Sequence, residues 1–123
     1  MGWFGKSQES KELPWNQLIS VDQLKEVLDS STEKPILLFK HSTRCSISSM
    51  AFSGFQSGWE GTEEEIGIYY LDLLKYRDIS NQIAELTGVM HQSPQVIVLK
   101  NNEVVYTATH TAISARAALS SIS

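Results

Sequence analysis

The chain has 123 residues and a formal net charge of −4, with 41% hydrophobic and 20% charged residues. This length suits one domain with its own core, and the acidic balance argues against nucleic acid as the main partner. No segment approaches the roughly 20 apolar residues that span a membrane, and the first ten residues lack the apolar core of a signal peptide. We therefore expect a cytoplasmic protein without a membrane partner.

The first predicted elements are an arm, a short strand and a helix. Residues 1–12 are polar and show no clear period, so we expect a flexible N-terminal arm before a single domain of residues 13–123. Residues 15–19 alternate enough for a short edge strand. Ser20 and Gln23 have the spacing of a capping box, which predicts that a helix begins after Ser20.

A buried strand and a second helix should follow. Residues 36–39 form an unbroken apolar run, which is typical of a strand buried on both faces. The apolar period then becomes helical, Gly54, Gly58 and Gly61 should weaken this helix, and we expect a loop over residues 58–65. The residues expected on its core face are Ile47, Met50, Ala51 and Phe55, and those expected on the opposite face are Ser46, Ser48, Ser49 and Ser53.

The second half of the chain predicts three more strands, a hairpin turn and two helices. Residues 66–71 suit a strand, and a helix capped by Asp78 or Ser80 should end at Gly88. Strands over 95–99 and 103–109 should pair through a tight turn of two asparagines, before a last helix capped at Ser114. The order β-α-β-α-β-α-β-β-α predicts an α/β fold, a mixed sheet of about five strands with helices on both faces.

Cys45 is the only cysteine and lies at or near the first turn of the second helix. Unpaired backbone N–H groups and the helix dipole favour a thiolate there, and Arg44 adds a positive charge. Thr43 and Ser48 are candidate hydroxyl donors to the sulfur. Judged from the residues alone, a buried and inert thiol is an equally good interpretation. A single cysteine excludes exchange between two cysteines of the chain, so any turnover needs an external thiol.

Three segments together resemble the YtxJ family of monothiol bacilliredoxin-like proteins, also called bacilliredoxin C, which have a thioredoxin-like fold. They are residues 39–48, which contain Cys45, residues 93–95, and residues 109–114. The resemblance covers about residues 13–122. The usual family motif is Thr-x-Cys-Pro-Ile-Ser, and here Ser46 stands where the proline would be.

The resemblance implies that Cys45 is the redox thiol of a thiol-disulfide oxidoreductase. It would remove a low-molecular-weight thiol, bacillithiol or a similar one, from S-thiolated client proteins, with that thiol as co-substrate, no tightly bound cofactor and no metal. Pro94 would be the cis-proline beside the cysteine, and the backbone of Ser93 would pair with an extended substrate. His110 and Thr111 would help bind the acidic end of the thiol. We expect the protein to act as a monomer.

Two other classes of function stay open at this point. Cys45 and Ser48 have the spacing of the Cys-Gly-Phe-Ser motif of monothiol glutaredoxins, which share an iron–sulfur cluster between two protomers. Ser46 and Ile47 replace the glycine and the aromatic residue of that motif. The third class is a binding module that has the fold but no chemistry, in which Cys45 would react no faster than an ordinary thiol.

Overall fold

The computed structural model describes residues 12–123, so the expected N-terminal arm lies outside the described residues except for Glu12. Five strands form one mixed sheet in the order β1-β3-β2-β4-β5. The strands are β1 (Asn16–Gln17), β2 (Ile36–His41), β3 (Gly67–Asp72), β4 (Gln95–Lys100) and β5 (Glu103–Thr109). The first three run parallel to one another, and β4 and β5 are antiparallel to their neighbours.

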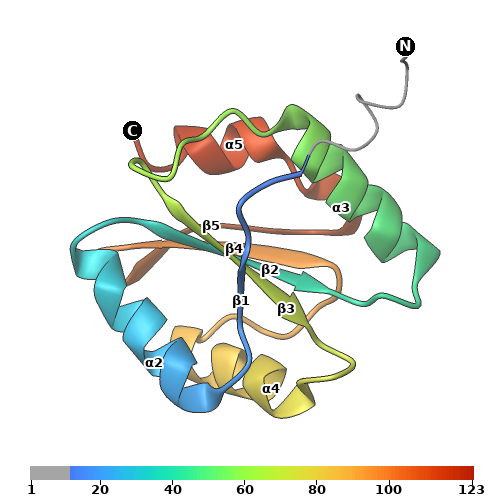
Figure 1. Ribbon diagram of the computed structural model, residues 1–123, viewed down its shortest axis with the longest axis horizontal. Helices are drawn as coiled ribbons and strands as arrows, with labels where there is room; N and C mark the ends of the chain where they lie inside the picture. The colour runs from blue at the N-terminus through green and yellow to red at the C-terminus, as the bar shows by residue number, and fades with distance from the viewer. Residues whose placement is uncertain (1–11) are drawn as a thin grey trace.

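Helices cover both faces of the sheet, as expected from the sequence. They are α2 (Val21–Asp29), α3 (Ser46–Gly58), α4 (Arg77–Thr87) and α5 (Ala115–Ser120), with short 3-10 segments η1 (Ser30–Thr32) and η2 (His110–Ala112). Figure 1 shows α3 and α5 on one face and α2 and α4 on the other. No helix within residues 12–123 is long and apolar enough to cross a membrane.

The central strand β2 is buried along its whole length, which confirms the interpretation of its apolar run. Successive side chains of a strand point to opposite faces of the sheet. Ile36 and Leu38 therefore pack against α2 and α4, whereas Leu37 and Phe39 pack against α3 and α5. One short strand thus contributes to two separate hydrophobic cores.

Several short sequence patterns adopt the local structures expected from them. The backbone N–H of Gln23 donates to Ser20 Oγ over 3.1 Å, and Gln23 Oε1 accepts from the backbone N–H of Ile19 over 2.7 Å, so α2 is capped. Asn101 and Asn102 have φ angles of 54° and 63°, as a tight hairpin turn requires. Ser114 caps α5 by accepting from the backbone N–H of Ala117.

The start of α4 differs from the prediction, because neither Asp78 nor Ser80 caps it. The helix begins at Arg77, and its N-cap, Tyr76, makes no side-chain capping bond. Asp72 organises the preceding turn instead, since its Oδ1 accepts from the backbone N–H groups of Leu74 and Lys75. The side chain that accepts backbone hydrogen bonds in the turn before α4 is thus that of the last residue of β3.

The buried face of α3 was also predicted wrongly. Ile47 and Met50 are exposed over 52% and 74% of their surface, whereas Phe55 is buried as expected. The helix turns Ser48 and Phe55 toward the sheet, and it ends at Gly58, where the loop is expected to begin. Two apolar side chains are therefore left on the surface one or two turns from Cys45.

Candidate functional site around Cys45

Cys45 is the N-cap of α3, and its side chain is partly exposed. The backbone N–H of Cys45 donates to Ser42 O over 3.2 Å, and Cys45 O accepts from the backbone N–H of Ser49 over 3.0 Å. Thr43 and Arg44 lie exposed in this turn. The cysteine therefore stands at the point where the chain leaves the sheet and the free N–H groups of α3 begin.

Ser48 lies one turn into α3, and its hydroxyl is fully buried. Ser48 Oγ accepts from the backbone N–H of Ser42 over 3.0 Å and lies 2.7 Å from His41 Nδ1. Its hydrogen bonds in the structure thus go to these two residues, and its expected donation to Cys45 stays a prediction. The serine joins the end of β2 to the helix and closes the turn that carries the cysteine.

His41 is the last residue of β2 and is almost completely buried. Its ring stacks on Phe52 with a centroid distance of 5.0 Å and an interplanar angle of 15°, and it contacts Tyr70 at 5.8 Å. Burial lowers the pKa of His41 below its ordinary value, and the negative charge of Asp72 opposes part of that effect. The imidazole is therefore neutral at pH 7.

The loop before β4 and the turn after β5 meet beside this region. The Ser93–Pro94 peptide bond is cis, and the backbone N–H of His110 donates to Pro94 O over 3.1 Å. Lys40 of β2 is paired with Gln95 of β4, so the cysteine turn and the proline loop leave the sheet at the same edge. Ser93 precedes β4, which leaves its backbone outside the strand ladder.

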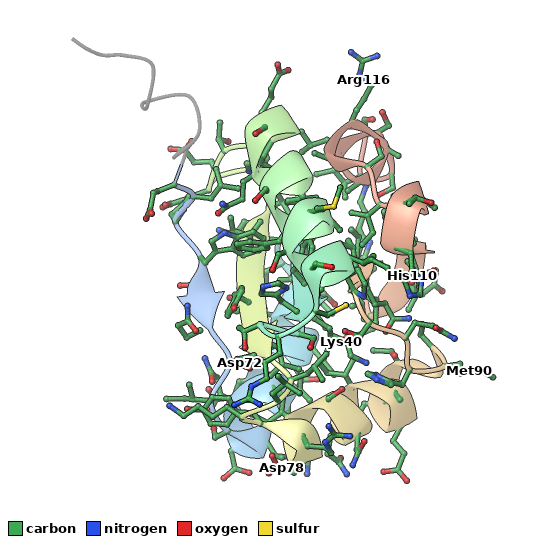
Figure 2. The ribbon with its side chains drawn as sticks, turned by 90° about the vertical axis from the view of Figure 1, so that its right-hand side faces the viewer. Lys40, Asp72, Asp78, Met90, His110 and Arg116 are labelled. Atoms are coloured by element: carbon green, nitrogen blue, oxygen red, sulfur yellow. The ribbon has the colours of Figure 1, made fainter. Side chains whose placement is uncertain are left out.

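The surface along α3 is hollowed and mostly apolar. A hollow of about 370 Å³ lies between α3 and the η2 segment. Its lining residues are Ile47, Met50, Ala51, Gly54, Phe55, His110, Thr111 and Ile113. His110 is visible beside α3 in Figure 2, where Met90 projects from the loop before β4. The structure thus brings the predicted His110 and Thr111 against the exposed face of the cysteine helix.

Lys40 is a buried charged residue whose burial is not evident from the sequence pattern. Its side chain has no exposed surface, and its Nζ has no hydrogen-bond partner among residues 12–123. Burial lowers the pKa of Lys40 from 10.5 to about 8. Burial also lowers the pKa of His91, as do the nearby charges of Lys40 and Arg77. The only signal in the sequence was the position of this lysine directly after a buried apolar run.

The described residues hold no cluster of three or more His, Cys, Asp or Glu side chains that could bind a metal ion. The residues that meet at this edge of the sheet are instead a single thiol, hydroxyl groups, imidazoles and apolar side chains. Such a set can carry out thiol–disulfide exchange, since the reacting groups are sulfur atoms and the protein has to hold one thiolate and orient its partner.

Known proteins share both the sequence pattern and the fold. The model of the family described as monothiol bacilliredoxin BrxC matches residues 16–118. A solved protein presented as a proposed oxidoreductase with a thioredoxin fold is 32% identical, with a TM-score of 0.72 over 85% of this chain and 90% of that one.

Two thioredoxins are more distant. A thioredoxin from Malassezia sympodialis is 21% identical, with a TM-score of 0.67 over 92% of this chain and 94% of that one. Thioredoxin f from spinach chloroplasts is 14% identical, with a TM-score of 0.62 over 96% of this chain and 94% of that one. At such identities the likeness shows the fold alone, and it confirms the expected thioredoxin-like architecture. Because the family match covers most of the chain and includes Cys45, this protein belongs to the monothiol bacilliredoxin family and has a thiol-based redox function.

Proposed function

We propose that the protein removes a low-molecular-weight thiol, bacillithiol or a similar one, from S-thiolated proteins through Cys45. The observation that carries this proposal is the position of Cys45, the one cysteine of a monothiol bacilliredoxin, as the N-cap of α3 and partly exposed. The backbone N–H groups of the first helical turn and the positive charge of Arg44 would stabilise a thiolate during exchange, and Thr43 would be a hydroxyl donor to it.

The reaction consists of two exchanges. In the first, the Cys45 thiolate attacks the small-thiol sulfur of the mixed disulfide, a new sulfur–sulfur bond forms, the old one breaks, and the client leaves as a thiolate. In the second, a free small thiol attacks the disulfide on Cys45, which releases a symmetrical small-molecule disulfide and restores the Cys45 thiolate. Each exchange conserves electrons, and the small thiol is consumed as the reductant.

The loop that contains Ser93 and Pro94 and the turn that contains His110 and Thr111 would bind the client and the small thiol. The backbone of Ser93, which stands before β4 and is followed by a cis peptide bond to Pro94, would pair with an extended client segment. His110 and Thr111 would contact the small thiol, because they line the hollow beside α3. The protein would act as a monomer in a compartment where thiols stay reduced, such as the cytosol, with client proteins and the small thiol as its partners.

The test is the release of the small thiol from an S-thiolated protein, measured with wild-type protein and with Cys45→Ala. Wild-type protein should accelerate release when free small thiol is supplied, and Cys45→Ala should not exceed the uncatalysed rate. Equal release by the two proteins would reject the proposal. Glutathione and bacillithiol conjugates of the same client, compared side by side, identify which small thiol is used.

A further inference from the structure

His41 and Ser48 form a buried pair directly behind the cysteine turn. His41 Nδ1 lies 2.7 Å from Ser48 Oγ, and both side chains are shielded from solvent. The backbone N–H of Ser42 donates to the same Ser48 oxygen over 3.0 Å. Since a backbone N–H can only donate, one lone pair of that oxygen is always occupied by Ser42.

The proton on Ser48 is therefore controlled by His41. When His41 Nδ1 carries no proton, it accepts the Ser48 hydroxyl hydrogen. When Nδ1 carries a proton, it donates to Ser48, whose oxygen then accepts two hydrogen bonds and whose own hydrogen becomes free to donate elsewhere.

The reacting cysteine, Cys45, stands three residues before Ser48 in the chain. Cys45 is the N-cap of α3, which makes Ser48 the third residue of the helix. Residues three apart lie on the same side of a helix, and the Cys45 side chain makes no capping hydrogen bond in the structure. A freed Ser48 hydrogen is thus placed at the end of the helix that carries the sulfur.

We propose that His41 is a positioning residue for Cys45 that acts through Ser48. With Nδ1 unprotonated it holds the Ser48 hydrogen away from the sulfur, and with Nδ1 protonated it releases that hydrogen to the Cys45 thiolate. The inference rests on the proposed function only in taking Cys45 as the reacting group. It adds that the thiolate gains a hydrogen-bond donor when the imidazole gains a proton.

Other groups around His41 affect the protonation of its imidazole. Asp72 on β3 favours the imidazolium, whereas burial favours the neutral form, and the ring of Phe52 on α3 stacks on the imidazole. Tyr70, also on β3, contacts the ring, and burial raises the pKa of its phenol, so it stays neutral at pH 5 to 8. Lys40 precedes His41 on β2 but points to the opposite face of the sheet, and Arg44 lies exposed in the turn.

The experiment measures the rate of Cys45 alkylation by iodoacetamide between pH 5 and pH 8.5 in four proteins. They are wild type, His41→Asn, Ser48→Ala and the double variant. Asparagine keeps a polar group near the position of Nδ1 but does not titrate. The ratio of the wild-type rate to the His41→Asn rate should rise about three- to tenfold as the pH falls through the His41 titration, because a hydrogen bond to a charged group is being gained. In the Ser48→Ala background the same ratio should stay constant.

Two results would overturn the inference. A wild-type to His41→Asn ratio that does not change with pH would show that His41 does not affect the sulfur. A change that persists without the Ser48 hydroxyl would show a direct effect of the imidazolium charge. If a variant does not fold, the ¹⁵N chemical shifts of the His41 imidazole are measured in wild-type protein. Nδ1 should lack a proton at pH 7.5, and a protonated Nδ1 at that pH would contradict the proposal. Alkylation needs no client protein, so failure here is separable from failure of thiol release.

Discussion

The backbone N–H of His110 donates to the carbonyl oxygen of Pro94 over 3.1 Å. This bond joins the turn after β5 to the cis-proline loop before β4, two segments that are 16 residues apart in the chain. His110 has a φ angle of 53°, a left-handed conformation that is uncommon for a residue other than glycine. The bond places η2, and with it Thr111, beside the exposed face of α3.

The exposed apolar side chain of Met50 should contribute to client binding. Met50→Asp puts a charge in the hollow between α3 and η2, and we expect the KM for an S-thiolated protein to rise about tenfold with little change in kcat. Leu86→Asp is the matched control, because Leu86 is also exposed but lies on α4, across the sheet. Steady-state kinetics with one client test this prediction. Equal changes of KM in the two variants would show that the hollow does not contribute to client binding.

Replacing the buried Lys40 with methionine should stabilise the protein. The pKa of Lys40 is about 8 in the folded state, against 10.5 for an ordinary lysine, so burial of its charge costs up to about 3 kcal/mol at pH 7. Between pH 8 and 10.5 the lysine is protonated in the unfolded state but not in the folded state. The free energy of unfolding of the wild type therefore rises relative to that of the variant as the pH increases. The advantage of Lys40→Met should thus be largest below pH 8 and shrink above it.

Urea unfolding at pH 7 and at pH 9.5 measures this difference, with the exposed Lys25→Met as control. The control should change the free energy of unfolding by less than about 0.5 kcal/mol at either pH. A Lys40→Met protein that is less stable than wild type at pH 7 would mean that the ammonium has a favourable partner.

Restoring the family proline at position 46 should be tolerated by the fold. Ser46 is the first residue of α3, where a proline costs no helical hydrogen bond, and the ψ angle of 122° at Cys45 suits a residue before proline. We expect Ser46→Pro to raise the free energy of unfolding by roughly 0.4–1 kcal/mol through the unfolded state. Denaturant unfolding measures this effect, and a loss of stability would indicate that the Ser46 N–H has a partner that matters.

Two glycines near α3 should respond to alanine in opposite ways. A Cβ at Gly54, in the middle of the helix, meets no atom within 4 Å, so Gly54→Ala should stabilise by roughly 0.5–1 kcal/mol. A Cβ at Gly61 would lie 2.5 Å from Trp59 Cζ2, so Gly61→Ala should be destabilising. Thermal unfolding of both variants tests the pair, and the same sign of change in both would contradict the packing described here.

Most of the fold could be predicted from local signals in the sequence. The capping pair Ser20 and Gln23, the buried run of β2 and the asparagine turn each depend on neighbouring residues, and each forms as expected. The position of Cys45 at the start of α3 also follows from a change of hydrophobic period, which is visible without the structure.

The environment of the site could not be predicted in the same way. Ile47 and Met50 have helical spacing with Phe55, but the helix buries Ser48 in their place, because His41 and Ser42 satisfy the hydroxyl group. That compensation involves residues of the preceding strand and turn, and hydrophobic periodicity does not report it. The burial of Lys40 likewise depends on β3 and β4, which flank the end of β2 and are distant in the sequence.

The transfer of the small thiol to Cys45 is the decisive test of a redox role for this thiol. Wild-type protein is mixed with one equivalent of an S-thiolated client in the absence of free small thiol, and both proteins are followed by intact-mass spectrometry. We expect that Cys45 gains the mass of the small thiol at the rate at which the client loses it, and that Cys45→Ala leaves the client unchanged. Loss of the small thiol from the client without an adduct on Cys45, or equal loss with Cys45→Ala, would contradict this role.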